Sequence, residues 1–200
     1  LPMKNIAVLI SGNGSNLQSI IDSLEKESIP ARICVVVSNR ADAYGIVRAQ
    51  KHGIATECIL RKNYKSNYDF NFAILEKLEY YEADYVVLAG YLNILSSDII
   101  RRYQNRIINI HPSLIPAFCG KGFYGLKVHQ AVLDYGCKIT GATVHFVDEG
   151  TDTCPIILQQ PVEVYDTDDA YTLSQRVLKI EHQILPKALG YLVKGKLEIN

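Results

Sequence analysis

The apolar run from Arg106 to Phe118, RIINIHPSLIPAF, contains two side chains that can do chemistry. Asn109 and His111 are two positions apart, and Pro112 follows directly. Along a strand such residues project from one face, while the intervening isoleucines project from the other. An amide beside an imidazole can stabilise an oxyanion at a carbonyl under attack, and the imidazole can also move a proton. The alternative is a strand-end histidine that simply bonds to the backbone.

Ser113 raises a second alternative, a serine hydrolase in which His111 and a distant aspartate activate the hydroxyl. The sequence has no G-x-S-x-G turn around this serine. Ser113 also lies too close along the chain to His111 for the geometry of a catalytic triad. We therefore expect no nucleophilic role for Ser113.

Further polar side chains lie on and after the strand-like segment ATVHFV, namely His145, Asp148, Glu149 and Asp152. A carboxylate near His111 would hold its ring and favour the protonated form. Three acids in one turn equally suit a solvated loop or a weak cation site, and the residues alone do not decide.

The remaining histidines carry weaker signals. His52 lies on a surface-like helix and His129 at a helix start, so both are interpreted as structural. His182 neighbours Glu181 in a long helical stretch, and its role stays open.

The segment LISGNGSNLQSII places a glycine-rich turn between the first apolar run and a helical pattern. Backbone N–H groups at such a turn, with a helix N-terminus behind them, can bind an anion. Gly12 and Gly14 let the chain turn, and Ser15 and Asn16 add side-chain hydrogen bonds. The Walker pattern is absent and Leu17 replaces the third glycine of the dinucleotide fingerprint, which leaves a small phosphate monoester as the candidate ligand. A tight turn with a polar helix cap is the alternative.

These residues must be positioned by the elements around them. Short β-branched runs alternate with amphipathic segments, a pattern typical of parallel strands covered by helices on both faces. We therefore predict an α/β fold with right-handed crossovers. Because Pro112 cannot continue a ladder, His111 should end its strand at the edge where such sheets bind ligands. The predicted strands are 5–10, 33–38, 85–90 and 106–111, and the predicted helices are about 16–27, 43–52, 67–81 and 96–104, the last opened by capping serines.

The second half changes character. Prolines and glycines predict a long loop over 112–127, followed by a short helix near 128–135. Two further strands, 138–150 and 155–164, are joined by an acidic turn. A helical stretch follows over 168–194, which Pro186 is expected to kink or divide. We predict a single domain over residues 1–200.

Composition narrows the class of protein. The 200 residues are 48% hydrophobic and 21% charged, with a formal net charge of zero, which disfavours a nucleic-acid or membrane-surface partner. No apolar run approaches a membrane span, and the N-terminus lacks a signal-peptide pattern. The five cysteines are widely spaced without a C-x-x-C pair, so neither a disulfide framework nor a zinc site is expected. We expect a cytoplasmic protein, monomeric or homodimeric.

Five segments taken together resemble the phosphoribosylglycinamide formyltransferases. They are VLISGNGSNLQSII, VVLAGYLNIL, IINIHPSLIPAF, GATVHFVDEGTDTCPIILQQ and IEHQILP, in that order, and the match runs from about residue 4 to residue 195. The resemblance implies a Rossmann-like formyltransferase fold, mostly parallel, with antiparallel additions in the C-terminal half. It implies a phosphate-binding half over about 3–100 and a catalytic and folate-binding half over about 101–200.

The resemblance also implies a reaction: a formyl group passes from 10-formyltetrahydrofolate to the amine of N1-(5-phospho-D-ribosyl)glycinamide in purine synthesis, without a metal. Asn109 and protonated His111 would stabilise the oxyanion on the formyl oxygen. Asp152 would keep His111 charged. The implied site residues are catalytic Asn109, His111 and Asp152; for the ribonucleotide Gly12, Asn13, Gly14, Ser15, Asn16 and Glu181; and for the folate Asn67, Leu92, Asn93, Ile94, Leu95, Asn109, Val147, Asp148, Glu149, Gly150, Thr151 and Asp152.

Three departures from the family pattern concern the folate. Leu92-Asn93 stands where many members have Met-Arg, and Asn67 stands where some carry a basic residue. Thr153-Cys154 replaces a common Gly-Gly. These changes are expected to tune folate affinity without touching the catalytic residues.

Three other functions compete with the ribonucleotide formyltransferase. The segment PAFCGKGFYG also resembles formyltetrahydrofolate deformylase, a hydrolase that normally adds an N-terminal regulatory domain. Methionyl-tRNA formyltransferase shares the Asn–His pair but needs a C-terminal RNA-binding domain. A non-catalytic phosphate- or folate-binding module would not need the full Asn–His–Asp set. We therefore expect the ribonucleotide transferase.

Overall fold

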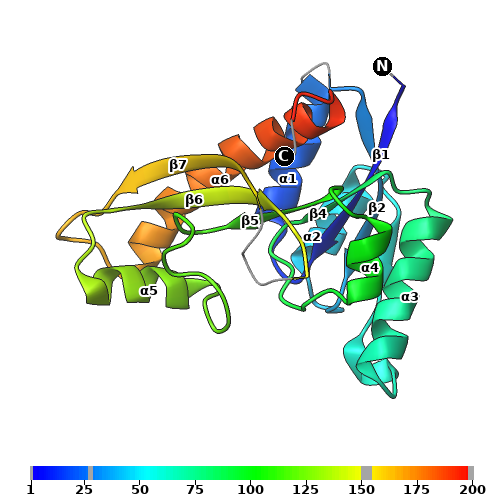
Figure 1. The fold of residues 1–200 in the computed structure, drawn as a ribbon, viewed down its shortest axis with the longest axis horizontal. Coiled ribbons are helices and arrows are strands. Elements are labelled where there is room, and N and C mark those ends of the chain that lie inside the picture. The colour runs from blue at the N-terminus through cyan, green and yellow to red at the C-terminus, as the bar shows by residue number, and fades with distance from the viewer. Residues whose placement is uncertain (1, 27–28, 150–154, 198–200) are drawn as a thin grey trace.

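One continuous sheet organises the protein. The computed structural model describes residues 2–26, 29–149 and 155–197, and within them seven strands lie in the order β3-β2-β1-β4-β5-β6-β7 (Figure 1). The strands are β1 (Lys4–Ile10), β2 (Ala31–Ser38), β3 (Thr56–Cys58), β4 (Tyr85–Leu88), β5 (Ile107–His111), β6 (Ile139–Phe146) and β7 (Ile156–Glu163). The helices are α1 (Ser15–Lys26), α2 (Tyr44–Lys51), α3 (Asn67–Tyr80), α4 (Ser97–Arg102), α5 (Leu126–Tyr135) and α6 (Ala170–Val193), with a short 3₁₀ turn at Arg61–Asn63.

The sheet is mostly parallel. Strands β3, β2, β1, β4 and β5 pair in parallel, whereas β6 is antiparallel to both β5 and β7. The predicted α/β class, with antiparallel additions in the C-terminal half, is confirmed. The strand order reverses at β1: β2 and β3 lie on one side of it, and β4 and the later strands lie on the other. Open α/β sheets bind ligands at the carboxyl ends of the strands at such a switch point.

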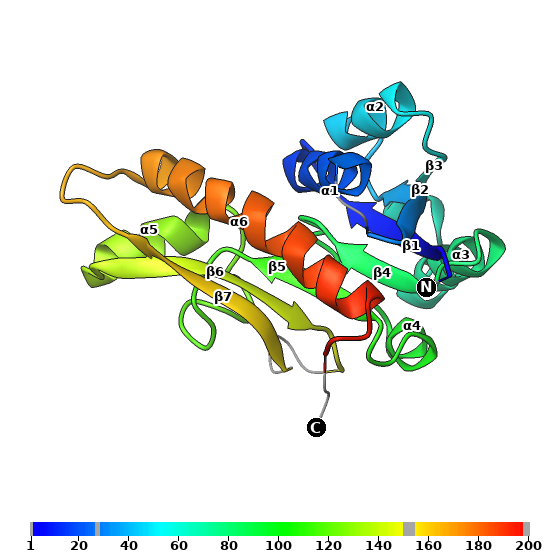
Figure 2. The same ribbon diagram turned by 90° about the horizontal axis from the view of Figure 1, so that it is seen from above.

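Alternating side chains of the central strands pack into two hydrophobic cores, one on each face of the sheet. On β1, Ile6, Val8 and Ile10 pack with α1 and α6, while Ala7 and Leu9 pack with α3 and α4. Figure 2 shows α1, α2 and α6 on one side of the sheet and α3 and α4 on the other. Burial on both faces explains why these strands read as nearly continuous apolar runs.

Asn109 and His111 follow the same alternation on β5. Ile108 and Ile110 belong to the core under α1 and α6, and Ile107 to the core under α3 and α4. The period of two then places both polar side chains on the face of Ile107, and His111 is the last residue of the strand. The predicted shared face is confirmed.

The elements differ from the prediction in three places. The edge strand β3 and the 3₁₀ turn after it are three residues each, too short to give a periodic signal. Ser96 occupies the N-cap position of α4 without a side-chain cap; its backbone N–H donates to Asn71 Oδ1 at 3.0 Å instead. Helix α6 runs through Pro186 undivided, because its buried neighbours, Leu185 and Ala188 among them, hold both halves against the sheet.

A half-buried ion pair fixes the start of α6. Asp168 accepts two hydrogen bonds from the Arg176 guanidinium at 2.7 Å each and one from the Tyr165 backbone N–H at 2.7 Å. The Arg176 guanidinium also lies over the Tyr165 ring at 4.0 Å. The hydrogen bonds from Arg176 are the main reason that the pKa of Asp168 falls to about 2.

We expect Asp168→Asn to lower the free energy of unfolding at pH 7 by about 2 kcal/mol. A depressed carboxyl pKa stabilises the fold above the unfolded value near 4, and this contribution is lost as pH falls through 2. Urea unfolding of both proteins at pH 7 and pH 3 measures the difference, which should shrink at pH 3. Asp166→Asn, which breaks an exposed pair with Lys138, is the control and should change little. A loss that is the same at both pH values would contradict the assignment.

Candidate active site

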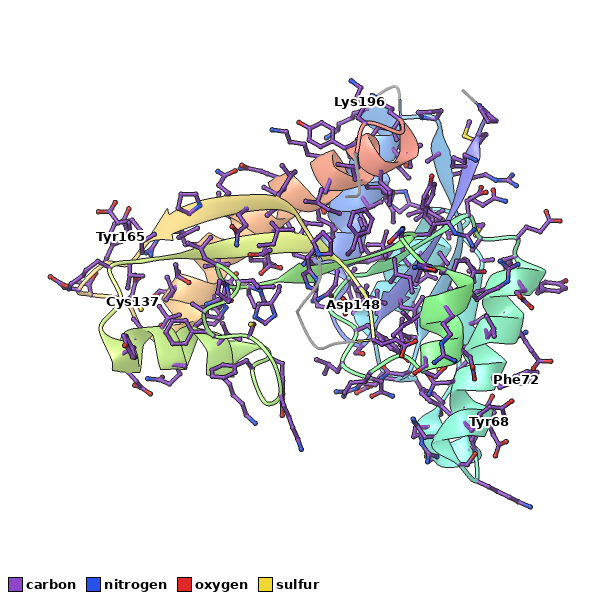
Figure 3. All side chains as sticks on the ribbon, viewed as in Figure 1. Tyr68, Phe72, Cys137, Asp148, Tyr165 and Lys196 are labelled. Carbon is purple, nitrogen blue, oxygen red and sulfur yellow. The ribbon has the colours of Figure 1, made fainter. Side chains whose placement is uncertain are left out.

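A cavity of about 1160 Å³ opens at the carboxyl ends of β4 and β5. Elements far apart in sequence meet there: the start of α1, the segments after β4, β5 and β6, the start of α5 and the middle of α6. Figure 3 shows Asp148, just after β6, in the region between the two halves of the sheet. The polar residues that line the cavity include Asn16, Asn93, Asn109, His111, His129, His145, Asp148, Glu149, Gln175 and Glu181.

A hydrogen bond between strands fixes the Asn109 amide. Asn109 and His145 face each other across the antiparallel β5–β6 pair, with Asn109 Nδ2 3.1 Å from His145 Nε2. His145 Nδ1 lies 2.7 Å from the Phe146 carbonyl oxygen, which can only accept. Nδ1 therefore carries the proton of the neutral ring, and Nε2 accepts from the amide. One N–H of Asn109 is used in this way, and the second has no partner among the described residues, so it can donate to a ligand.

A backbone carbonyl orients His111 in the same manner. His111 Nε2 donates to the Phe118 carbonyl at 2.9 Å, which makes Nδ1 the nitrogen that gains and loses a proton. The loop that supplies this carbonyl is held by Ser113, whose hydroxyl donates to the Ala117 carbonyl at 2.6 Å. Ser113 is fully buried, so it supports the loop rather than acting as a nucleophile.

The structure brings His129 to the cavity, although no sequence pattern distinguishes it from a structural histidine. Its pKa is lowered to about 4, mainly by burial and further by the nearby His111. His129 thus stays neutral near neutral pH. No hydrogen-bond partner for its buried Nδ1 exists among the described residues. The signal that could have identified it, the packing of α5 against α6 beside the cavity, is tertiary.

A buried carboxyl from α6 meets the start of α1. Glu181 Oε2 accepts from Asn16 Nδ2 at 2.8 Å, and both residues are buried. Burial raises the pKa of Glu181, and the Asn16 hydrogen bond offsets part of this rise. Asn16 Oδ1 is buried without a partner in the described chain, an arrangement that a ligand donor would complete.

The glycine-rich turn lies beside this pair. Gly14 has a φ of +75°, in the region that favours glycine, and its carbonyl accepts from the Gln18 N–H at 2.9 Å in the first turn of α1. Gly12 and Asn13 are exposed, and Gly14 and Ser15 half-exposed. Of the predicted anion-binding segment Gly12–Asn16, only Asn16 lines the cavity itself; the rest forms the surface next to it.

The residues expected at the folate divide into three groups. Leu92, Asn93, Ile94, Leu95, Val147, Asp148 and Glu149 all line the cavity. The structure does not bring Asn67 there: its carbonyl accepts from Asn71 Nδ2 at 2.9 Å at the start of α3, and Figure 3 shows the neighbouring Tyr68 far from Asp148. Gly150, Thr151 and Asp152 lie outside the described residues.

Among residues 2–26, 29–149 and 155–197, no helix is long and apolar enough to span a bilayer. Within the same ranges, no cluster of three or more histidine, cysteine, aspartate or glutamate side chains is arranged to hold a metal ion.

Comparison with known proteins identifies the class. The formyl transferase family matches residues 4–189, and the chain belongs to this family. It is 41% identical over 198 residues to the phosphoribosylglycinamide formyltransferase of Haemophilus influenzae, covering 99% of this chain and 91% of that protein. Within the family, the chain therefore belongs to the phosphoribosylglycinamide formyltransferases.

A solved structure and a larger relative agree with this placement. The glycinamide ribonucleotide transformylase 1 of Symbiobacterium toebii superposes with a TM-score of 0.94 at 42% identity, covering 99% of this chain and 91% of that one. The trifunctional purine biosynthetic protein adenosine-3 of Bos taurus is 45% identical over 195 residues, which are 98% of this chain. The chain spans only 19% of the length of that bovine relative.

We expect His145→Phe to lower formyl-transfer turnover about tenfold or more, because the Asn109 amide loses the acceptor that orients it. Phenylalanine is a planar ring of similar size, so folding should be retained. Steady-state kinetics measure the effect, with the half-exposed His52→Phe as the matched control. Unchanged turnover in His145→Phe would show that the amide needs no such support.

Proposed function

We propose that this enzyme transfers the formyl group of 10-formyltetrahydrofolate to the amine of N1-(5-phospho-D-ribosyl)glycinamide, or glycinamide ribonucleotide. The products are the N-formyl ribonucleotide and tetrahydrofolate, in the synthesis of purines. One observation carries the proposal: an amide fixed by His145 and an imidazole fixed by a carbonyl lie on one strand end inside the cavity. Membership of the ribonucleotide formyltransferases supports this acceptor and disfavours the hydrolase alternative.

The cavity fits both substrates in size and chemistry. Its 1160 Å³ exceeds the roughly 300–1,000 Å³ of ordinary small-molecule sites. Apolar side chains such as Leu88, Leu95 and Val147 offer a surface for a flat ring system, while Asn16 and Glu181 form a polar end for the ribonucleotide. In the described part of the chain, three lining residues (Asn16, Tyr91 and His129) leave a buried polar atom without a partner. Ligand groups would satisfy such atoms.

The chain's own residues would act on a carbonyl under attack. When bound, 10-formyltetrahydrofolate supplies the formyl group. The second N–H of Asn109 would donate to the formyl oxygen as negative charge develops there. Protonated His111 would stabilise the same charge. Its Nδ1 proton would pass to the leaving nitrogen, and Nδ1 would then take up the proton released by the attacking amine, each step directly or through water. Asp152 would hold His111 in its charged form.

The phosphate of the ribonucleotide is assigned to Gly12, Asn13, Gly14, Ser15 and Asn16, and its glycinamide and ribose to Glu181. The folate is assigned to residues 92–95 and 147–152, with the N-terminal half binding phosphate and the C-terminal half carrying catalysis. We place the enzyme in the cytoplasm, as a monomer or homodimer with small-molecule substrates and no nucleic-acid partner.

The direct test is to incubate the protein with 10-formyltetrahydrofolate, with and without glycinamide ribonucleotide. We expect tetrahydrofolate to form only when the acceptor is present. Loss of the formyl group without the acceptor would favour a deformylase, and no turnover in either sample would favour a binding module.

Asn109→Ala should lower turnover by about 100-fold or more, because one oxyanion donor is removed.

Asp152→Asn separates catalysis from binding. We expect turnover to fall far more than ribonucleotide binding weakens, because the variant keeps its shape but no longer favours protonated His111. Turnover should be measured across pH 5–9 and binding by calorimetry. Near-wild-type turnover across that range would remove Asp152 from the mechanism.

A further inference from the structure

The glycine-rich turn is built against α2 as well as α1. The Gly45 N–H, in the first turn of α2, donates to the Gly12 carbonyl at 3.1 Å. A Cβ placed on Gly14 would lie 2.5 Å from Gly45 Cα, so the two backbones are in direct contact. A side chain at either glycine would separate them. The orientation of the turn therefore depends on what α2 presents to it.

Arg48 lies on α2, one helical turn after Gly45, and binds the glycine-rich turn through Asn13. Its Nε donates to the Asn13 carbonyl and its Nη2 to Asn13 Oδ1, each at 2.8 Å. A guanidinium binds two acceptors in one fixed plane, so this fork sets both the peptide and the side chain of Asn13. Nη1 also lies 3.4 Å from Gln18 Oε1 on α1, which joins both helices to the turn.

The contact between Arg48 and the Asn13 carbonyl also sets the direction of the Gly14 N–H. The Asn13 carbonyl and the Gly14 N–H belong to one planar peptide unit and point in opposite directions. Because Arg48 holds the carbonyl toward α2, the Gly14 N–H is directed to the other side of the turn. An N–H fixed in this way is the kind of donor that an anion at a glycine-rich turn requires.

The charge of Arg48 is not cancelled by a carboxylate. In the described ranges Arg48 forms no ion pair, and its contacts are neutral: Asn13, Gln18 and the Tyr44 ring, whose centroid is 5.0 Å from Cζ. Its field reaches α6, where burial and, after it, Arg48 lower the pKa of His182. The first turn of α1 also contains no acidic residue. Positive potential thus remains beside the turn and favours a dianion.

We propose that Arg48 is a positioning residue of the phosphate subsite, which fixes the Asn13–Gly14 peptide for the substrate phosphate and adds an uncompensated positive charge behind it. The proposal rests on the proposed function in one respect, because it takes the anion at this turn to be the phosphate of glycinamide ribonucleotide.

The test compares the wild type with Arg48→Gln and Arg48→Lys. For Arg48→Gln we expect the KM for glycinamide ribonucleotide to rise about tenfold or more, with kcat and the KM for the folate within about twofold. Lysine keeps the charge but cannot form the fork, so Arg48→Lys should be intermediate. Arg40→Gln is the matched control: Arg40 pairs with Asp42 just before α2 and should leave all constants unchanged.

Two further measurements distinguish positioning from general damage. Glycinamide riboside, which lacks the phosphate, should be used equally well by the wild type and Arg48→Gln. Asn13→Ala removes one acceptor while Arg48 stays, and its effect on the ribonucleotide KM should not add to that of Arg48→Gln in the double variant. Equal loss with the riboside, additive effects, or a ribonucleotide KM within twofold of the wild type would overturn the proposal.

Calorimetry with ribose 5-phosphate keeps this proposal separate from the proposed function. If the wild type fails to formylate the ribonucleotide, the proposed function fails, while the dissociation constant of ribose 5-phosphate still reports on Arg48. A weakening of about tenfold in Arg48→Gln, absent from Arg40→Gln, supports the positioning role. An unchanged dissociation constant contradicts it.

Discussion

The hydrogen bond from Asn109 to His145 is the interaction on which the site depends. It joins β5, the last parallel strand, to β6, the first antiparallel one, at the edge where the cavity opens. Because the Phe146 carbonyl fixes the tautomer of His145, the amide can adopt one orientation only. A donor oriented before substrate arrives needs no rearrangement as charge develops, which is the source of most oxyanion stabilisation.

Burial in this cavity shifts the pKa values of two titratable side chains, His129 and Glu181. His129 is held neutral by burial and by His111, and Glu181 has a raised pKa in an apolar surrounding with one amide donor. Near neutral pH the His129 imidazole therefore adds no positive charge to the site. Groups with pKa values shifted by burial in a cavity are typical of functional sites.

Much of this arrangement could be predicted from the sequence, for identifiable reasons. The period of two in RIINIH and the following Pro112 determine both the shared face of Asn109 and His111 and its place at the sheet edge. The partner of Asn109 could not be predicted, because His145 is 36 residues away and meets it only through the β5–β6 register. His129 and Arg48 were missed for the same reason: one lies on an ordinary amphipathic helix, and the other on a helix whose packing against the glycine turn is tertiary. Pro186 does not divide α6 as one form of the prediction expected, since burial on both sides outweighs one lost backbone hydrogen bond.

The dependence on strand register also constrains how chains of this kind can change length over time. A single-residue insertion within β6 would turn His145 to the opposite face and leave Asn109 without its acceptor. The pairing of β6 with β7 already contains a shift beside His145, from Val144–Leu158 to His145–Ile156, and the irregularity is taken up on β7. Insertions and deletions should therefore collect in β7 rather than in β6, while the interval from Gly141 to Phe146 keeps a constant length among functional relatives.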